Sequence, residues 1–429
     1  MRQLRRIIKG IAIVAPLLAS SFVKADEYHY RDLMVGERAT GLGGAYVAIS
    51  DDPSGIYHNP AGIMFSFENY FSLSANAYNV NSITYKNVFG TQNYNRSSSG
   101  VVPNFFGFIQ NYRSMKWGFA IVVPNSDSID QDDEITNISA STGGAATLDR
   151  KLFRQDTTTL FGPAIAFEAF KNFTVGLSVF VDYHVDKAID NQLITYNADA
   201  SNKERFYTHE LSYNRTILSL MPKLGFQYMP APKWSLGLVI SKPVTMSGSY
   251  KEKTVENAFD TSTNLPADYN YVLSHDLVKG KTNTSPKELE NLEVGFGVAY
   301  LPSKKFLLSS DFYYYGESKF SDGKTAVSTY NFSLGSEYYF TDGFAGRFGF
   351  FTNNANTPTI VTGMANQLDN VNFYGLSTGL SWINSGSSFT LGLTYSTGSG
   401  KAQAIGDSTV IQNAEAYNAM VYLTGSYQL

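Results

Sequence analysis

The sequence predicts an all-β protein, a 14-stranded antiparallel transmembrane β-barrel with an N-terminal hatch, or plug, inside the lumen. Three observations carry this prediction. Apolar residues recur at every second position along most of the chain, which is the pattern of strands with one apolar face. Short turns alternate with long polar loops. Aromatic residues reach 14% of the chain while charged residues are only 16%. Outer-membrane barrels combine alternating strands, unequal connections and aromatic girdles.

The first 25 residues are typical of a secretory signal peptide. Basic residues at 2–9 precede an almost wholly apolar run at 11–23, and a cleavage site ends at Ala25. An apolar run of about 13 residues is too short to cross a hydrocarbon core of about 30 Å. We therefore assign 1–25 to a signal peptide, 26–65 to the hatch and 66–429 to the barrel.

Fourteen segments read as strands. Eight alternate clearly, at 117–123, 173–185, 234–240, 292–300, 306–314, 330–340, 374–382 and 389–395. Six weaker segments lie at 66–88, 99–113, 150–170, 204–229, 344–353 and in the C-terminal stretch. The last strand alternates from Tyr417 to Leu429, so we expect it to pair with the first strand and close the barrel.

The connections are of two kinds. Tight turns with Gly, Pro, Asn or Asp are expected at 113–114, 171–172, 230–233, 302–304, 341–343 and 384–387. Long polar loops are expected at 89–99, 124–150, 190–204, 252–287, 353–370 and 399–413. Short periplasmic turns and long external loops predict the outer membrane of a diderm bacterium.

Several function classes find no support. A net charge of -4 and the absence of a long basic run argue against nucleic acid, and the absence of cysteine excludes disulfides and thiolate metal sites. The five histidines lack metal-ligand spacing, so we expect neither a metal nor a cofactor. Asp182 and His184 share an inward face, where a hydrated lumen lining is favoured over a proton-sensitive contact. Asp127 to Glu134 form an acidic run, for which a solvated loop is favoured over a cation site.

One motif invites an enzymatic interpretation. Gly375 to Gly379 spells G-x-S-x-G, which in hydrolases places the serine on a sharp turn between a strand and a helix. Here Ser377 lies in the middle of a predicted strand, opposite the apolar face. We therefore expect no catalytic residue, and a lipase in the barrel wall is the weaker alternative.

The stretch from Gly41 to Ile63 is the most unusual part of the chain. It fails as a dinucleotide-binding loop because Tyr46 stands where a third glycine is required. It fails as an acid/base pair because the adjacent Asp51 and Asp52 would point to different sides of a regular element. A compact plug explains it better, with glycines for close contacts, a capped short helix and an Asn-Pro turn. The candidate hatch residues are Gly41, Gly43, Gly44, Asp51, Asp52, Asn59, Pro60, Ala61 and Gly62.

Three signatures within this stretch, G-x-G-G-A-Y, A-x-S-D-D and N-P-A-G, resemble the hatch of the FadL/TodX-type outer-membrane transporters of long-chain fatty acids and aromatic hydrocarbons. The resemblance implies passive uptake of a hydrophobic ligand, hatch movement at Asn59, Pro60 and Ala61, and lateral release where the third strand kinks. It also implies outer-membrane lipid and the barrel-assembly machinery as partners of a monomer. Some relatives serve secretion systems, so a secretion partner or a lipid or protein shuttle is the alternative function.

Two further predictions concern the barrel wall. Gly118, between Trp117 and Phe119, is the candidate kink of the third strand because it lacks a side chain. Apolar residues that turn inward are the candidate ligand path, with packing between plug and wall as the equal alternative. They are Phe180, Val239, Leu307, Tyr313, Tyr315 and Tyr339.

Overall fold

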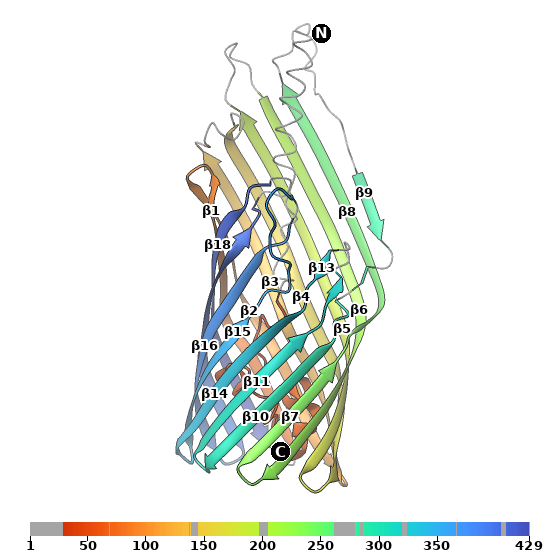
Figure 1. Cartoon of the computed structure of the whole chain (residues 1–429), viewed down its shortest axis with the longest axis vertical. Coiled ribbons are helices and arrows are strands. Elements are labelled where there is room, and N and C mark those ends of the chain that lie inside the picture. Colours follow the sequence, from red (N-terminus) through yellow and green to blue (C-terminus); the bar gives the residue numbers. More distant parts are fainter. Residues whose placement is uncertain are drawn as a thin grey trace.

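The computed structural model describes residues 29–67, 69–136, 138, 145–196, 205–260, 279–283, 286–287, 289–319, 324–365, 367–404 and 409–428. The predicted signal peptide and Leu429 lie outside the described residues. Within the described part, the chain folds as a tall, closed barrel with short helices inside its lower half (Figure 1).

The barrel has 14 antiparallel strands, as predicted. Two of them are interrupted, so the elements run β1 Tyr70–Phe89, β2 Gln92–Tyr112, β3 Met115–Thr136, β4 Ala145–Phe170, β5 Phe173–Tyr196, β6 Arg205–Ala231, β7 Trp234–Ser241, β8 Val244–Asp260, β9 Lys279–Asn283, β10 Glu293–Ser303, β11 Phe306–Tyr315, β14 Thr329–Thr341, β15 Phe344–Asn353, β16 Asn370–Asn384, β17 Ser387–Ala402 and β18 Gln412–Gln428. The short β12 Ser318–Lys319 and β13 Thr325–Ala326 pair only with each other.

Closure occurs between the first and last strands. β1 pairs antiparallel with β18, from Tyr70 opposite Gln428 to Tyr85 opposite Ala414. The expectation that the C-terminal strand closes the barrel is therefore confirmed. The predicted tight turns fall at one end of the barrel, which is the lower end in Figure 1. The long loop predicted at 89–99 is instead a tight turn at the other end, because β1 runs to Phe89 and β2 begins at Gln92.

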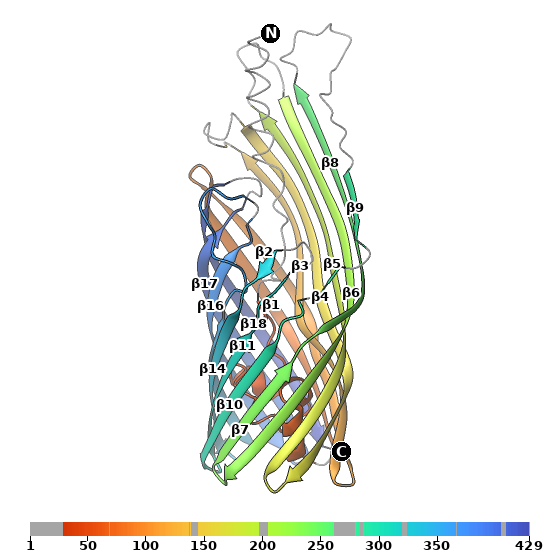
Figure 2. The same ribbon diagram turned by 45° about the vertical axis from the view of Figure 1, so that its right-hand side comes forward.

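One side of the wall stands higher than the other. β3 to β6 and β8 rise well above β10 to β16 (Figure 2). Much of what we predicted as loop is strand here, because β3 runs to Thr136, β5 to Tyr196 and β8 to Asp260. The acidic run at 127–134 accordingly lies in β3 and not in a loop. Above the membrane the outer face of a strand no longer has to be apolar, so the alternation of apolar and polar residues that reveals a membrane strand weakens there.

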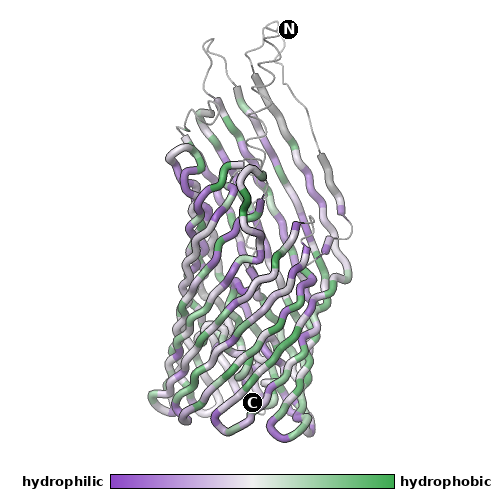
Figure 3. The backbone as a smooth tube through the Cα atoms, viewed as in Figure 1, coloured by the Kyte–Doolittle hydropathy of each residue, from purple (hydrophilic) through white to green (hydrophobic). Residues whose placement is uncertain are grey.

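The outer face of the lower barrel is apolar. Exposed large residues include Leu376, Leu380 and Trp382 on β16 and Leu391 and Leu393 on β17, and apolar positions gather in the lower half (Figure 3). In the aromatic clusters at the ends of β11 and β14 only alternate members face outward, because Tyr314 and Tyr338 are exposed whereas Tyr313 is buried. An apolar outer face with aromatic rims on a closed barrel defines a transmembrane β-barrel of the outer-membrane type.

The residues before β1 lie inside the barrel as a plug; we call residues 29–67 the hatch. It contains α2 Glu37–Gly41, α3 Gly55–His58 and the 3₁₀ helix η2 Pro60–Phe65, and both ribbon views place these helices inside the barrel. Nearly every hatch side chain from Leu33 to Ile63 is buried. Among the described residues, no helix has the length and apolar character needed to cross a membrane.

The lipid assignment of β17 can be tested by stability. Leu391 is exposed and lies four residues above the lower end of β17, so Leu391→Arg should lower the free energy of unfolding in lipid vesicles by about 2–4 kcal/mol. Ser399→Arg, on the same face but eight residues higher, should cost at most about 1 kcal/mol. Equal costs in denaturant titrations would contradict the placement of the apolar belt.

Candidate functional site

The Asn59-Pro60-Ala61-Gly62 element holds one half of the hatch against the wall. Asn59 is fully buried, and its Nδ2 donates to the carbonyl oxygens of Val47 at 2.7 Å and Phe226 at 3.1 Å. Its Oδ1 accepts from the Ala61 backbone N–H at 3.2 Å, which caps η2. One side chain thus ties together two hatch segments and β6.

Inward glycines of the wall create the space for this element. A Cβ at Gly225 of β6 would stand 2.1 Å from Asn59 Oδ1, and a Cβ at Gly176 of β5 would stand 2.3 Å from the Pro60 carbonyl carbon. Thr174 Oγ1 also donates to the Ala61 carbonyl at 3.0 Å. The sequence analysis missed these glycines. Glycine at inward positions of neighbouring strands is the signal that could have identified them.

The other half of the hatch is held by charges. Arg38 of α2 donates from Nη2 and Nε to the two carboxylate oxygens of Glu337 on β14, at 2.8 and 3.1 Å. Arg347 of β15 donates to the same carboxylate at 2.6 Å. Asp51 pairs with Arg38, and Glu37 accepts from hydroxyl groups of β17. Because Glu337 is only 1% exposed, removing either arginine would strand a buried charge.

Close backbone contacts complete this side. Gly43 and Gly44 have φ values of 65° and 79°, which favour glycine, and a Cβ at Gly41 would stand 2.9 Å from Arg347 Cδ. The next turn presents the N–H groups of Tyr46 and Val47 to one carboxylate oxygen of Asp311, at 2.7 and 2.8 Å.

The rest of the motif packs within the hatch. Gly62 lies against Ser50, where a Cβ would approach the Ser50 Cβ to 2.4 Å. The residues that the sequence singled out are therefore brought together, as the contact surface of the hatch with itself and with the wall.

Two titratable hatch groups are buried without a counter-charge on them. Asp52 Oδ1 accepts from the Ser54 N–H at 2.7 Å, and burial raises the pKa of Asp52 from 3.8 to about 6. His58 Nε2 lies 2.9 Å from the Val35 carbonyl oxygen, and burial lowers the pKa of His58 from 6.5 to about 3. Both groups favour the neutral form when the hatch is docked.

The barrel wall has an opening in its backbone pairing between β2 and β3. The two strands pair from Tyr112 opposite Met115 up to Phe105 opposite Val122, and no further. Just above, β3 slips in register against β4 between Val122 and Asn125, which places Pro124 at an irregularity. Proline has no N–H to donate to a neighbouring strand. We call the gap between 101–104 of β2 and 123–126 of β3 the window.

The hatch closes this window from inside. The Leu33 N–H donates to the Pro124 carbonyl oxygen at 3.0 Å, and Asn104 Nδ2 donates to the Met34 carbonyl oxygen at 2.6 Å. Leu33 and Met34 are each about 5% exposed and pack in an apolar cluster with Val102 at its edge. A hatch segment therefore bonds to both rims of the gap.

The register break of the third strand does not lie at Gly118, where we predicted a kink. Gly118 pairs in regular register with Ile109 on one side and Ala164 on the other. A Cβ there would stand 2.8 Å from the Ile56 side chain of the hatch, so this glycine provides space for the hatch. The irregularity lies instead between Val122 and Asn125, where Pro124 has no N–H to donate to a neighbouring strand.

The six inward residues of the predicted ligand path are mostly in contact with the hatch. Phe180 packs with Ile56 and Ile63, Leu307 with Tyr46, and Val239, Tyr313 and Tyr315 form a cluster with Val47. Tyr339 is half-buried. In this closed arrangement they lie at the interface of plug and wall, and Tyr315 also lines a cavity.

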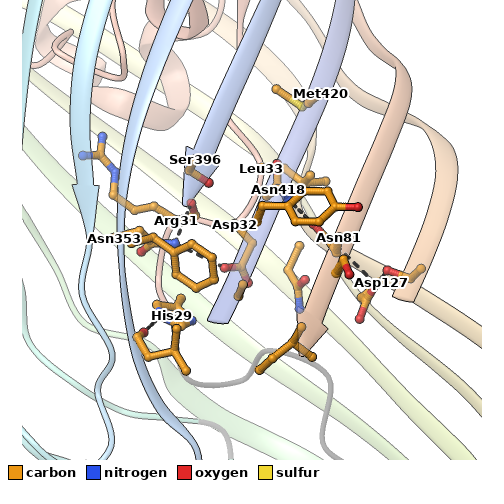
Figure 4. Close-up of a pocket in the computed structure, with 18 of the residues that line it drawn as sticks. His29, Arg31, Asp32, Leu33, Asn81, Asp127, Asn353, Ser396, Asn418 and Met420 are labelled. Atoms are coloured by element: carbon orange, nitrogen blue, oxygen red, sulfur yellow. Dashed lines mark hydrogen bonds between the residues drawn. The ribbon is translucent and has the colours of Figure 1, made fainter. Parts of the chain in front are cut away.

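Two cavities lie on either side of the N-terminal segment 29–34 and share His29 and Asp32 in their linings. The first, of about 170 Å³, lies between Tyr57, Tyr315, Leu160 and Lys223. The second, of about 120 Å³, reaches the β2 and β3 seam at Ser98 and Asp127. Figure 4 shows Arg31 and Asn353 on one side of the second cavity, Asn81 and Asp127 on the other, and Asp32 between them.

Both linings mix apolar and charged side chains. The first cavity has Leu160, Met221 and three tyrosine rings beside a Lys223 and Glu293 pair at 3.0 Å. A cavity of about 150 Å³ holds a single aromatic ring. The size therefore suits one ring or a length of alkyl chain.

The remaining motif residues serve the wall. Ser377 lies within β16 and its Oγ donates to the Gly41 carbonyl oxygen at 3.1 Å, so it anchors the hatch. His184 contacts Asp156 of β4, with 3.1 Å between Nε2 and Oδ1. Asp182, which we placed on the same inward face, lies two residues away on the same strand.

A closed barrel with a plug inside it and a gap in the backbone pairing of one wall has the architecture of a plugged outer-membrane β-barrel. Comparison with known proteins agrees in fold. No family model and no curated protein matches the chain. A Pseudomonas aeruginosa FadL homologue superposes with a TM-score of 0.60 at 15% identity, over 93% of this chain and 99% of that one.

Two toluene transporters give similar values. TodX of P. putida has a TM-score of 0.61 at 12% identity, over 93% of this chain and 99% of its own, and TbuX of Ralstonia pickettii has 0.56 at 13%, over 92% and 100%. The chain therefore has the FadL/TodX fold, which confirms the resemblance seen in the sequence.

The space that Gly225 leaves for Asn59 gives a direct test of how the hatch docks against the wall. Gly225→Ala should displace the Asn59 element, because the new Cβ would meet Asn59 Oδ1 at 2.1 Å, and hydrogen exchange at residues 55–65 should accelerate by at least about tenfold. Gly425→Ala is the control, since nothing lies within 4 Å of that position. Unchanged exchange in Gly225→Ala, with the barrel assembled, would contradict the proposed fit.

Acid should reveal the opposing effects of Asp52 and His58. As pH falls from 6.5 towards 3, His58 binds a proton in the undocked hatch but not in the docked hatch, so hatch docking weakens. As pH falls from 6 to 3.8, docked Asp52 keeps a proton that the undocked one lacks, so docking strengthens. The two effects offset each other in the wild type.

Asp52→Asn keeps the bond to Ser54 but removes the titratable carboxyl group whose protonation offsets the effect of His58. Hatch docking in this variant should lose about 2 kcal/mol relative to wild type between pH 7 and pH 4.5, measured by hydrogen exchange of residues 29–65. His58→Gln should show the opposite slope. Parallel pH profiles for all three proteins would refute the assignment.

Proposed function

We propose that this protein takes up small hydrophobic molecules across the outer membrane by passive diffusion, releasing them sideways through the window when the hatch segment at Leu33 and Met34 withdraws. The observation that carries the proposal is the window itself, a break in backbone pairing that is filled by hatch and not by wall. A purely structural barrel has no use for such a gap, because each unpaired group facing lipid is costly.

The depth of the window supports lateral release. Val123 lies eight residues beyond Met115 at the lower end of β3. With a rise of about 3.3 Å per residue and a tilt of about 40°, it stands about 20 Å above that end. An apolar belt about 25 Å tall then places the window in the outer half of the hydrocarbon. A molecule leaving there enters lipid directly and crosses no water.

The cavities favour an amphipathic ligand. Leu160, Met221 and Tyr315 offer an apolar surface, while Arg215 and Lys223 lie beside them. A pure hydrocarbon would remove water from these charges without replacing its hydrogen bonds. A molecule with an apolar body and one polar end, such as a fatty acid, suits this lining better than toluene does.

The structural neighbours support uptake of a hydrophobic molecule, without distinguishing a fatty acid from a hydrocarbon. The solved structures with this fold include a FadL homologue and transporters described as toluene transporters. Hatch movement around Asn59, Pro60 and Ala61 is the gating step that we propose for this chain, because Asn59 joins η2, the Val47 turn and β6.

The test locks the hatch to the rim. The chain has no cysteine, so Met34→Cys with Asn104→Cys provides a unique pair at a contact of 2.6 Å between side chain and backbone. A short bifunctional thiol reagent should reduce fatty-acid uptake into proteoliposomes to the level of an unrelated barrel. Each single cysteine variant, treated identically, should retain uptake.

Two outcomes would count against the proposal. Full uptake by the cross-linked protein would show that the window is not the route. Wild-type uptake no faster than that of an unrelated barrel would remove the transport function altogether.

A further inference from the structure

Above the window, side chains take over from the missing backbone pairing. Ser98 Oγ of β2 donates to Asp127 Oδ1 of β3. Four residues further along β3, Gln131 accepts from the Ser97 N–H at 3.1 Å and donates to the Asn95 carbonyl oxygen at 2.7 Å. Near the top, Gln92 Nε2 donates to the Thr136 carbonyl oxygen at 3.1 Å. We call these three links the polar zipper.

Asp127 is the lowest link and the best connected. The same oxygen that accepts from Ser98 also accepts from Asn81 Nδ2 of β1 at 3.4 Å. Asn81 in turn accepts from Asn418 of β18. The carboxylate thus bonds across two strands, and the second cavity lies directly behind it, as Figure 4 shows for Asn81 and Asp127.

The zipper begins where the hydrocarbon ends. Asp127 lies twelve residues beyond Met115, which puts it about 30 Å above the lower end of β3 by the same rise and tilt, and thus above an apolar belt about 25 Å tall. Water and headgroups solvate polar side chains at that height, so a side-chain zipper is stable there. Below it, between Val122 and Asp127, neither backbone nor side-chain bonds join the two strands in the described residues.

We propose that the polar zipper, closed at its lower end by Asp127, sets the upper edge of the window and so limits the width of the molecules that leave through it. This inference rests on the proposed lateral route and adds a specificity-determining element to it. The free length of β3 between the last backbone pair and Asp127 is five residues, about 16 Å. Because β2 and β3 are joined at both ends of this length, by the Phe105 and Val122 pair below and by the Ser98 and Asp127 bond above, the distance by which they can separate between these points is limited. A slim alkyl chain needs little separation of the strands, whereas a wide fused-ring body requires the lowest link to part.

The experiment compares two probes that differ mainly in width, hexadecanoate and a pyrene-labelled fatty acid, in proteoliposomes of full-length protein. The variant Asp127→Ala with Gln131→Ala opens the two lower links. The ratio of pyrene-labelled to plain uptake should rise about tenfold, the factor that accompanies the loss of one to two net hydrogen bonds. Uptake of hexadecanoate should stay near wild type.

Asp127→Asn is the matched control. An asparagine oxygen can still accept from Ser98, so its uptake ratio should equal that of the wild type, which a general loss of barrel stability would not reproduce. Asp127→Ala alone serves if the double variant fails to assemble, with a smaller rise of the same sign.

The outcomes separate the two claims. Normal hexadecanoate uptake with an unchanged ratio in the alanine variants overturns the zipper as a width limit and leaves the lateral route intact. A ratio that rises equally in Asp127→Asn also overturns it, because the hydrogen bond would then not be the cause. Wild-type hexadecanoate uptake no faster than that of an unrelated barrel overturns the proposed function, and the inference with it.

Discussion

The structure follows from the need to pair every backbone N–H and C=O in a medium without water. A sheet meets this need only by closing on itself, and β1 pairs with β18 along fifteen registered positions from Tyr70 to Tyr85. The same constraint makes the exception informative. Where β2 and β3 stop pairing above Phe105 and Val122, the rim groups turn to the hatch for partners, and higher up to side chains of the opposite strand.

Hatch and wall are a single packing arrangement, with two sides of different chemistry. On β5 and β6 the contact is steric, since Gly176 and Gly225 leave room for the Asn59 turn. On β14 and β15 it is electrostatic, since Glu337 receives both Arg38 and Arg347 in a buried site. A movement that starts at Asn59 can therefore free one side of the hatch while the ion pairs retain the other, because a buried charge pair is costly to separate.

The membrane-spanning part of the fold was predictable because lipid imposes an apolar residue at every second position. Above the membrane lipid no longer imposes this alternation, so the sequence predicted loops for the upper parts of β3, β5 and β8. The hatch was predictable from its Gly, Asp and Asn-Pro signatures. Its contacts were not, since the approach of Gly225 to Asn59 depends on where two distant segments meet in space.

The irregularity of the third strand lies at a different residue from the one that the sequence predicted. Gly118 drew attention because it lacks a side chain, yet its ladder is regular on both sides, and Pro124 disturbs β3 because it lacks a hydrogen-bond donor. The Leu33 N–H donates to the Pro124 carbonyl oxygen, and the Asn104 side chain donates to the Met34 carbonyl oxygen.

That pair of bonds has a consequence for the resting protein. If the segment withdraws with nothing in its place, the rim groups face hydrocarbon with no partner, at about 1–3 kcal/mol each. In the proposed mechanism, the cost of these unpaired groups in the bilayer favours return of the segment, so an empty barrel reseals without any device of its own.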